Sequence, residues 1–425
     1  MKVLVIGNGG REHAIIWKLK QSPKIEKIFV TDNGNPGINE IAEPISLSKT
    51  DFPFLADFVQ HNNIDYTIVG PEQPLALGIV NFFKSKNLRI FGPTKEGAQI
   101  ESSKIFAKNF MKKYNIPTAD FNTFSNPDSA IDFLKNTQYP VVIKADGLAA
   151  GKGAVIVKSF EEAKTIIEKF MIKDIFSGSG KKIVVEELLQ GEELSILAIT
   201  DGNSFQLLLP SQDHKQVFDG DKGPNTGGMG AFAPVPFIKE KDIQTIKEKI
   251  ISPTIEGFKK EKIEYKGVLY AGLMMTNDGP KVIEFNCRMG DPETQVVLPL
   301  LKTDLIDIVE AVCNDNLSNI TIENHIDKSA IIVILASGGY PGVYEKNKKI
   351  TGLDKITDPD IIVFHAGTKK DLQNNLLTNG GRVLGITAVK NSLEEAYNAV
   401  YNEIKKIHFE NMHYRKDISK RKNLE

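Results

Sequence analysis

The stretch PVVIKADGLAAGKGAVIVK, residues 140–158, places a run of β-branched residues on either side of a glycine-rich loop. Apolar runs of this kind, bounded by turn residues, are typical of buried strands. Strands joined by so short a loop pair in antiparallel fashion, because a parallel pair needs a crossover of a dozen or more residues. The stretch therefore predicts an antiparallel hairpin around a flexible loop at residues 146–153.

The loop of this hairpin is similar to a phosphate-binding P-loop but does not match one. Gly147 and Gly151 are one residue too close, and Gly153 stands where a P-loop has a metal-binding hydroxyl. Lys144 lies within the apolar strand, where an uncompensated charge is costly, and Lys152 lies on the loop. The two cations and flexible amides favour closure over a polyphosphate, with two surface lysines as the alternative.

Strand-like runs continue through the middle of the chain with few crossovers between them. A helix is expected at 160–172, and a polar loop, CRMGDPETQ, follows the last run. Paired strands with few crossovers favour an α+β region built on antiparallel sheets. The expected strands lie at 183–187, 194–200, 205–210, 268–275 and 281–286.

The two ends of the chain follow other patterns. In the first hundred residues, short apolar runs alternate with helix-like stretches, which predicts a parallel sheet with ligands beyond the carboxyl ends of its strands. After residue 327 a small β-rich unit is closed by a helix at 392–406. The expected strands at the two ends lie at 2–7, 27–32, 66–72 and 88–93, and then at 330–336, 361–368 and 381–389.

Residues 94–113 have the apolar spacing of a single helix. Lys104, Lys108 and Lys112 recur every four residues along one flank of it. A lysine row of this kind is typical of a solvated helix face. We therefore expect most of the row to lie in solvent.

The composition argues against several classes of partner. Lys and Arg number 53 and Asp and Glu 54, for a net charge of −1, so neither nucleic acid nor an anionic membrane is expected to bind. Cys287 and Cys313 form no C-x-x-C pair, which suits a reducing cytosol. The start, MKVLVIGNGG, is not a signal peptide, and no apolar run approaches the ~20 residues of a membrane helix. A cytoplasmic location is expected.

The motif GNGGREHA follows the first strand and opens a helix. It begins as a dinucleotide fingerprint at Gly7 and Gly9, but Glu12 stands at the third glycine position, which disfavours an NAD-dependent oxidoreductase. The amides near Gly9 and Gly10 still suit a single phosphate at a helix N-terminus. A tight turn without a ligand is the alternative.

Two further motifs offer polar groups next to predicted strands. In VVEELLQGEELS, the turn from Glu186 to Leu189 could bind an adenine edge and Glu193 a ribose, or the segment is a solvated acidic turn. In VIEFN, alternation puts Glu284 and Asn286 on one strand face. A carboxylate and an amide oxygen suit Mg²⁺ or Mn²⁺ between phosphates, with a merely polar strand face as the alternative. Arg288 follows, with a planar fork for phosphate or carboxylate.

The segment SQDHK leads into the glycine-rich stretch GPNTGGMGAF, residues 223–232. Asp213 and His214 offer an ammonium partner and a proton acceptor, or they belong to a hydrogen-bonded turn. The glycines suggest a phosphate cradle, but the hairpin at 140–158 is the better candidate for that role. We therefore expect GPNTGGMGAF to lie near Arg288, as a backbone-lined wall of the acceptor pocket.

Taken together, these motifs resemble the phosphoribosylamine–glycine ligase family of the ATP-grasp superfamily, from one end of the chain to the other. The most specific are GPNTGGMGA, EFNCRMGDPETQ and the terminal YRKDI. The resemblance implies that ATP phosphorylates glycine to glycyl phosphate and that the amine of phosphoribosylamine attacks it, giving glycinamide ribonucleotide, ADP and phosphate in purine synthesis. Another ATP-grasp carboxylate–amine ligase and a non-catalytic nucleotide-binding regulator are the alternatives.

The resemblance also implies a role for each group of residues. ATP would be bound by Lys104, Lys144, Gly147, Lys152, Gly153, Glu186, Glu187, Leu188, Leu189 and Glu193. Phosphoribosylamine would be bound by Gly9, Gly10, Glu12, Gly70, Pro71 and Glu72. Glycine and its acyl phosphate would be bound by Asp213, His214, Thr226, Gly227, Gly228 and Arg288. Catalytic roles fall to Lys152, Asp213 and Arg288.

The implied fold combines α/β and α+β domains. It has a parallel α/β substrate domain at 1–118, an ATP-grasp lid at 119–195, a large ATP-grasp subdomain at 196–327 and a small C-terminal domain at 328–425. Mg²⁺ or Mn²⁺ would be held by Glu284 and Asn286, although strand 268–275 lacks the additional acidic ligand of many ATP-grasp enzymes. The implied partners are ATP, glycine and phosphoribosylamine, with a transient contact to the enzyme that produces phosphoribosylamine.

Overall fold

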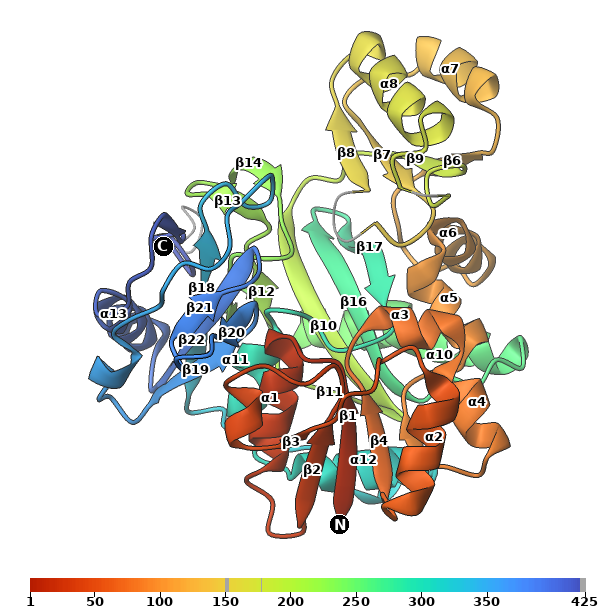
Figure 1. Ribbon diagram of the computed structural model, residues 1–425. Coiled ribbons are helices and arrows are strands. Elements are labelled where there is room, and N and C mark those ends of the chain that lie inside the picture. The colour runs from red at the N-terminus through yellow and green to blue at the C-terminus, as the bar shows by residue number, and fades with distance from the viewer. Residues whose placement is uncertain (150–152, 177, 421–425) are drawn as a thin grey trace.

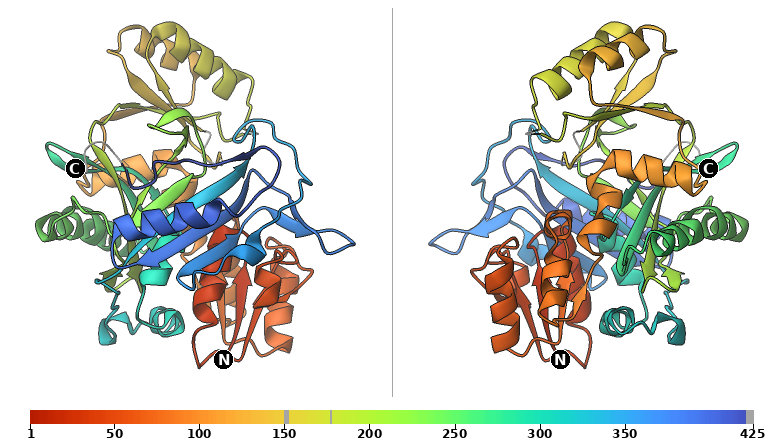
Figure 2. Two further views of the ribbon diagram at one scale, coloured as in Figure 1. Left: turned by 90° about the vertical axis from the view of Figure 1, so that its left-hand side faces the viewer. Right: turned by 90° about the vertical axis from the view of Figure 1, so that its right-hand side faces the viewer.

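The computed structural model describes residues 1–149, 153–176 and 178–420 (Figure 1). In that part of the chain, no helix combines the length and apolar character needed to cross a membrane. The N-terminal region lies at the bottom of Figure 1, the central strands β10, β16 and β17 above it, and the C-terminal region beside them. The strands β6 to β9 and their helices stand clear of this body in both views of Figure 2.

The N-terminal region is the parallel sheet that the alternating pattern predicts. Its strand order is β3-β2-β1-β4-β5, and every neighbouring pair is parallel. Apolar side chains of β1 are fully buried between the helices on the two faces. The strands are β1 (Lys2–Ile6), β2 (Lys27–Val30), β3 (Glu43–Pro44), β4 (Tyr66–Val69) and β5 (Ile90–Phe91). The helices are α1 (Gly10–Leu19), α2 (Phe52–His61), α3 (Glu72–Leu77) and α4 (Ile79–Ser85).

The segment after this sheet forms two helices, α5 (Lys95–Ser102) and α6 (Lys104–Lys113), so the expectation of a single helix is wrong. Ser103 between them is extended and caps α6, accepting a hydrogen bond from the amide of Phe106 at 3.1 Å. Its hydroxyl also donates to Asp146 Oδ1 at 2.9 Å. The break therefore arises from a cap and a distant partner.

The region predicted to be the lid folds as a small antiparallel sheet with its own apolar core. Its strand order is β6-β9-β7-β8, and α7 and α8 pack over it. The predicted hairpin is confirmed, with Val141 opposite Val157 and Lys144 opposite Ala154. The elements are β6 (Phe121–Phe124), α7 (Pro127–Lys135), β7 (Val141–Ala145), β8 (Ala154–Val157), α8 (Phe160–Ile167) with a π-helical turn (Glu168–Ile172), and β9 (Ile183–Glu187).

The central sheet is antiparallel, in the order β11-β10-β16-β17. The predicted hairpin of β16 and β17 is confirmed, with Glu284 opposite Gly272 and Asn286 opposite Tyr270. The strands are β10 (Glu192–Thr200), β11 (Phe205–Leu207), β16 (Gly267–Thr276) and β17 (Gly279–Asn286). The helices are α9 (Glu240–Ile246), a π-helical turn (Lys247–Ile251), α10 (Ser252–Lys260), α11 (Thr294–Leu300) and α12 (Leu305–Cys313).

The last sheet combines the C-terminal strands with two short strands from the middle of the chain. Its order is β12-β15-β18-β22-β19, and β23 pairs with β18. The segment that contains SQDHK and GPNTGGMGAF is therefore joined to the C-terminal region by backbone hydrogen bonds. Its strands are β12 (Gln212–Asp213), β15 (Gly230–Ala233), β18 (Ser329–Ser337), β19 (Ile361–His365), β22 (Arg382–Lys390) and β23 (Met412–His413). Beside it lie the pairs β13 (Gln216–Phe218) with β14 (Lys222–Asn225) and β20 (Thr368–Lys370) with β21 (Leu376–Thr378), and helix α13 (Leu393–Ile404).

Candidate active site

The N-terminal loops leave neighbouring strands at the same edge of the parallel sheet. Ile6 at the end of β1 lies opposite Val69 at the end of β4. The carboxylate of Glu12 lies between the two loops, accepting a hydrogen bond from the amide of Gly9 at 2.6 Å. A Cβ atom on Gly70 would lie 2.2 Å from Glu12 Oε1, so only glycine fits there. The loops with Gly9, Gly10, Gly70, Pro71 and Glu72 thus form one continuous surface around Glu12.

Arg288 connects this surface to the end of β17. Its Nη2 atom lies 2.8 Å from Glu101 Oε1 and donates to Asn286 Oδ1 at 3.2 Å. Its Nε atom lies 3.4 Å from Glu72 Oε2. Burial raises the pKa of Glu72, but Arg288 and Arg11 outweigh burial and hold that pKa below its ordinary value. Arg288 therefore contacts both Glu72, in a loop predicted to bind phosphoribosylamine, and Asn286, one of the two predicted metal ligands.

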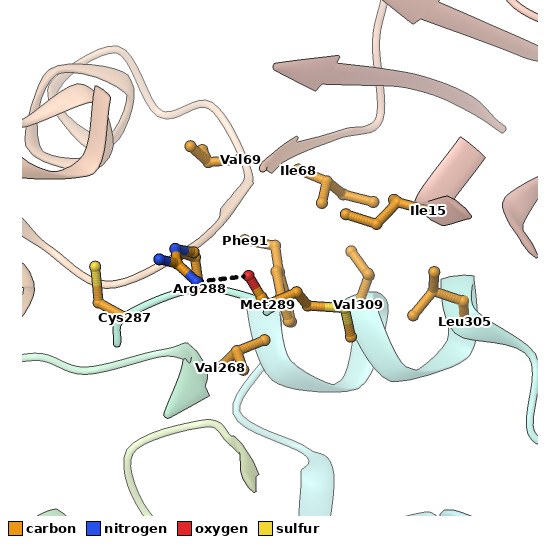
Figure 3. A pocket seen from close by; sticks show the side chains of 11 residues that line it. Ile15, Ile68, Val69, Phe91, Val268, Cys287, Arg288, Met289, Leu305 and Val309 are labelled. Atoms are coloured by element: carbon orange, nitrogen blue, oxygen red, sulfur yellow. Dashed lines mark hydrogen bonds between the residues drawn. The ribbon is translucent and has the colours of Figure 1, made fainter. Parts of the chain in front are cut away.

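A small apolar cavity lies behind Arg288 (Figure 3). Its volume is about 20 Å³, which is room for roughly one water molecule. Ile68, Val69, Phe91 and Met289 are among the side chains that line it. The cavity is a packing void in the core, too small for any of the substrates.

The candidate metal ligands lie among cations. Four cationic side chains act on the charge of Glu284: Lys104, Lys144, Lys215 and Arg288. Burial raises the pKa of the Glu284 carboxyl, but these cations outweigh burial and hold the pKa below its ordinary value. Glu284 is therefore an ionised carboxylate at neutral pH, in surroundings that attract further negative charge.

The donors at this position fit a magnesium-like ion. Glu284 supplies a carboxylate and Asn286 an amide oxygen, both on the end of β17. In the described part of the chain, no group of three or more His, Cys, Asp or Glu side chains could hold a metal. Mg²⁺ is commonly bound by one or two protein oxygens, with waters and substrate phosphates completing its shell. The pair matches that pattern.

Lys144, which was predicted to bind ATP, shares the carboxylate of Glu186 with Lys108, which was not. Lys144 on β7 forms an ion pair with Glu186 Oε1. Lys108 on α6 lies 2.5 Å from Glu186 Oε2 and is only 3% exposed, so the solvated-face expectation is wrong for it. Lys104 donates to the carbonyl of Gly147 at 3.3 Å, at the start of the hairpin loop. Lysines from α6 and β7 are thus gathered at the base of the lid.

The roles of several other residues in binding ATP remain predictions. Lys152 lies outside the described residues. Of the four residues predicted to bind adenine, Glu186 and Glu187 lie in strand β9, which pairs with β6 and β7. Only Leu188 and Leu189 lie beyond the end of the strand. Glu193 lies 2.9 Å from the amine of Lys215.

Lys215, Lys108 and Glu101 were missed in the sequence. Burial lowers the pKa of the Lys215 amine, but Glu193, Asp213 and Glu284 outweigh burial and raise it well above its ordinary value. Lys215 thus interacts with Glu193, the predicted ribose ligand, with Asp213 of SQDHK, and with Glu284, a predicted metal ligand. The signal that the sequence offered for Lys215 was its place in SQDHK, directly after Asp213 and His214.

The segments SQDHK and TGGMG form an antiparallel ribbon, which we call the acceptor ribbon after its predicted role. The amide of His214 donates to the carbonyl of Gly230 at 2.9 Å, and that of Met229 donates to the carbonyl of His214 at 2.8 Å. SQDHK and TGGMG are therefore its two sides. Asp213 is nearly buried and His214 is fully buried.

The glycines of this ribbon pack on the loop that follows Arg288. Gly228 has a φ of +105°, and a Cβ atom there would lie 2.4 Å from the Cδ atom of Pro292. Arg382 donates from Nη1 to the carbonyl of Gly227 at 2.5 Å and from Nη2 to Asp291 Oδ2 at 2.9 Å. The stretch thus packs on residues 291–292 of the loop that follows Arg288, and its role as a wall of the acceptor pocket stays a prediction.

Family models match the chain in three consecutive segments. They are described as the N domain of phosphoribosylglycinamide synthetase at residues 1–101, its ATP-grasp (A) domain at 102–294 and its C domain at 330–421. Together they span most of the chain in the order found in that enzyme.

Two curated relatives match over almost their whole length, and a third matches over part of its length. The chain is 52% identical over 420 residues to a phosphoribosylamine–glycine ligase of Caldanaerobacter subterraneus, covering 99% of each chain. It is 48% identical over 424 residues to that of Clostridium acetobutylicum, covering 99% of this chain and 100% of the relative. It is also 47% identical to a trifunctional purine biosynthetic protein of Gallus gallus, covering 99% of this chain and 42% of that protein.

Solved structures have the same architecture. The crystal structure of a phosphoribosylamine–glycine ligase from Thermotoga maritima matches with a TM-score of 0.86 and 34% identity, covering 98% of this chain and 100% of that one. The biotin carboxylase domain of a Hydrogenobacter thermophilus 2-oxoglutarate carboxylase, in complex with MgADP, matches with a TM-score of 0.73 and 15% identity, covering 97% of this chain and 91% of that one. At that identity the second match shows the fold alone.

Proposed function

The chain belongs to the phosphoribosylglycinamide synthetase family, and we propose how its site carries out the reaction of that family. The activity is the ATP-dependent ligation of glycine to phosphoribosylamine in purine biosynthesis, giving glycinamide ribonucleotide. The observation that carries our assignment of roles is that cations from two segments meet at the end of β17: Lys144 donates to the carbonyl of Ile283 at 3.0 Å and Arg288 donates to Asn286 Oδ1 at 3.2 Å, on either side of Glu284. A carboxylate, a polyphosphate and a divalent cation can be brought together only where such charges balance them.

The ATP phosphates are held at the base of the lid. Lys104 and Lys144, with Lys152 on the loop, neutralise the phosphates, and the turn from Glu186 to Leu189 receives the adenine. Glu193 accepts hydrogen bonds from ribose hydroxyls. Glu284 and Asn286 would hold Mg²⁺ or Mn²⁺, and the bound ion would neutralise charge on the phosphates.

The first chemical step forms glycyl phosphate. An oxygen of the glycine carboxylate attacks the γ-phosphorus of ATP, a new P–O bond forms, and the bond to the β-phosphate oxygen breaks to release ADP. Asp213 binds the ammonium group of glycine, and Arg288 directs its fork at the developing acyl phosphate. A closing loop at 146–153, as the sequence leads us to expect, would exclude the water that hydrolyses this intermediate.

The second step forms the amide. The N-terminal loops at Gly9, Gly10 and Gly70–Glu72 hold the phosphoribosyl group, with its phosphate at the start of α1. The amine attacks the carbonyl carbon of glycyl phosphate, the C–O bond to phosphate breaks, and the amine loses a proton. His214 on the acceptor ribbon is the candidate acceptor of this proton, and Thr226–Gly228 form the wall that leaves room for the amine. The protein contributes position and charge rather than covalent chemistry.

We also infer a cytoplasmic location and a transient contact with the enzyme that produces phosphoribosylamine. The sparse cysteine usage supports the first, and the placement of the N-terminal loops at one edge of their sheet supports delivery of the substrate there.

The assignment is tested by following labelled glycine into glycinamide ribonucleotide. The purified protein, with ATP, Mg²⁺ and phosphoribosylamine, is expected to convert glycine in preference to other amino acids and small carboxylic acids. A panel in which a different acid or amine is consumed much faster would favour another ATP-grasp carboxylate–amine ligase.

A further inference from the structure

The terminal motif YRKDI, residues 414–418, holds a buried arginine that no step of the reaction uses. Arg415 is 0% exposed. It donates to both carboxylate oxygens of Asp417, from Nε at 2.8 Å and from Nη2 at 2.7 Å. Its Nη1 atom donates to Asp221 Oδ1 at 2.8 Å and to the carbonyl of Gln216 at 3.1 Å. The arginine therefore binds the C-terminal tail to the β13–β14 hairpin.

Neighbouring groups of the tail grip the same hairpin. The amide of Gly220 donates to Asp417 Oδ2 at 2.8 Å, and the amide of Lys416 donates to Asp219 Oδ1 at 2.8 Å. The imidazole Nε2 of His413 lies 2.8 Å from the carbonyl oxygen of Val217. These contacts cover the whole turn of the hairpin, which is bonded to the tail through side chains and backbone alike.

The tail is itself fixed to helix α13. The hydroxyl of Tyr401 donates to the carbonyl of Arg415 at 2.8 Å, and that of Tyr397 donates to the carbonyl of Lys416 at 2.7 Å. We call the contacts of Arg415, Lys416 and Asp417 with the hairpin and with α13 the clamp. The clamp thus connects the β13–β14 hairpin to a helix that packs on the C-terminal sheet. This connection gives the hairpin a rigid support.

The hairpin has little support of its own. Its strands pair only at Gln216 with Asn225 and at Phe218 with Lys222, with an irregular register between them. All of β14 is exposed. An isolated two-stranded hairpin is marginally stable at best in water. Val217 anchors the first strand in a small apolar cluster with Met229 and Ala336, so it is the turn at 219–221 whose position depends on the clamp.

Both ends of the hairpin lead directly into the acceptor wall. The carbonyl of Lys215 accepts the amide and the hydroxyl of Thr226, both at 2.8 Å. The hydroxyl of Thr226 in turn accepts the amide of Gly228 at 2.9 Å. His214 lies close enough to Asp417 to act on its charge. A shift of the hairpin would therefore be passed to Thr226 and Gly228.

We propose that Arg415 and Asp417 are positioning residues for the acceptor half of the reaction, acting through the β13–β14 hairpin on the Thr226–Gly228 wall. This inference rests on the proposed role of that wall. A buried guanidinium needs its carboxylate partners, because an unpaired buried charge is strongly destabilising. The arginine fork is also not replaceable by lysine, which cannot reach two oxygens of one carboxylate in the same way. The clamp therefore sets the position of the wall, and its loss affects glycine and phosphoribosylamine more than ATP.

The test compares Arg415→Lys, Asp221→Asn and the control Lys416→Ala in the full-length protein. Lys416 is the exposed neighbour in the same motif, and only its backbone takes part in the clamp. Asp221→Asn removes a carboxylate at the exposed turn of the hairpin, and it carries the test if Arg415→Lys does not fold. For each protein, KM for ATP, glycine and phosphoribosylamine, kcat and Tm are measured.

For Arg415→Lys we expect kcat/KM for glycine and phosphoribosylamine to fall by about tenfold, since a small misplacement of a positioning group costs up to about 10²-fold. KM for ATP stays within about twofold, Asp221→Asn shows a smaller change in the same direction, and Lys416→Ala matches the wild type. Equal changes in KM for all three substrates, or none, would overturn the inference. A wild-type protein inactive with glycine and phosphoribosylamine would instead contradict the proposed function.

Discussion

The two halves of the site are built in different ways. On the side proposed to bind ATP, buried charged side chains meet from three elements, as Lys108 on α6 and Lys144 on β7 do at Glu186 on β9. On the side proposed for the acceptor, Gly228 presents backbone against Pro292 and the carbonyl of Asp291, and Gly227 packs on the guanidinium of Arg382. The contrast follows the chemistry, because phosphates must be neutralised whereas the attacking amine needs open space.

The largest expected effect comes from the ionised carboxylate in the charged half. Glu284→Ala should lower kcat by at least about 10³-fold, the upper end of the cost of one lost electrostatic contact to a transition state. The protein should stay folded, because the removed carboxylate lies at the end of a paired strand. Turnover is measured across a magnesium titration, with Asp278→Ala in the exposed turn before β17 as the matched control. Near-normal activity at saturating Mg²⁺ would rule out the ligand assignment.

The next effect is expected where the two halves meet. Arg288→Lys keeps the charge but loses the fork that reaches Glu101 and Asn286. We expect kcat to fall by about 10²-fold, as for the loss of a transition-state donor. Stopped-flow or steady-state ADP release measures it, and an unchanged kcat would remove Arg288 from the reaction centre.

A smaller and more selective effect is expected in the glycine-built half. Gly228→Val places a side chain against Pro292 at a φ of +105°, so the wall must shift. We expect kcat/KM for glycine and phosphoribosylamine to fall by about tenfold while ATP affinity is retained.

The control for this variant separates backbone strain from position. Gly279 has a φ of +108° and no atom within 4 Å of an added Cβ, so Gly279→Val carries similar strain at an open site. Gly279→Val should leave kcat/KM for glycine and for phosphoribosylamine unchanged. A loss of ATP binding in Gly228→Val before any loss of acceptor use would show that the stretch is a phosphate cradle.

The smallest expected effect tests the buried pairing in the charged half. Lys108→Met leaves Glu186 with Lys144 alone, which draws that amine toward the carboxylate and away from phosphate. We expect KM for ATP to rise about fivefold, equivalent to about 1 kcal/mol. Lys112→Met, on the exposed face of the same helix, is the matched control. Identical ATP constants in the two variants would contradict a role for Lys108.

The sequence predicted the elements that local patterns determine. The hairpin at 140–158 and the pair β16–β17 were found because β-branched runs, turn residues and alternation are all local signals. The edge that gathers the N-terminal loops followed from parallel strands, whose carboxyl ends share one side. Alternation along the strand was enough to predict that Glu284 and Asn286 lie together on β17.

What the sequence did not predict depends on distant partners. Ser103 ends a helix because it also bonds to Asp146, and Lys108 is buried because Glu186 lies beside it. The pairing of β15 with β18 joins segments that no local pattern relates. Such contacts between distant segments are set by packing and charge balance in the folded chain.

The central claim is that one site couples ATP to both acceptor substrates, and ADP release tests it most directly. Release is measured with ATP and Mg²⁺ alone, with glycine, with phosphoribosylamine, and with both. The account predicts sustained ADP release only when both are present. ATP turnover at the same rate in all four conditions would contradict it.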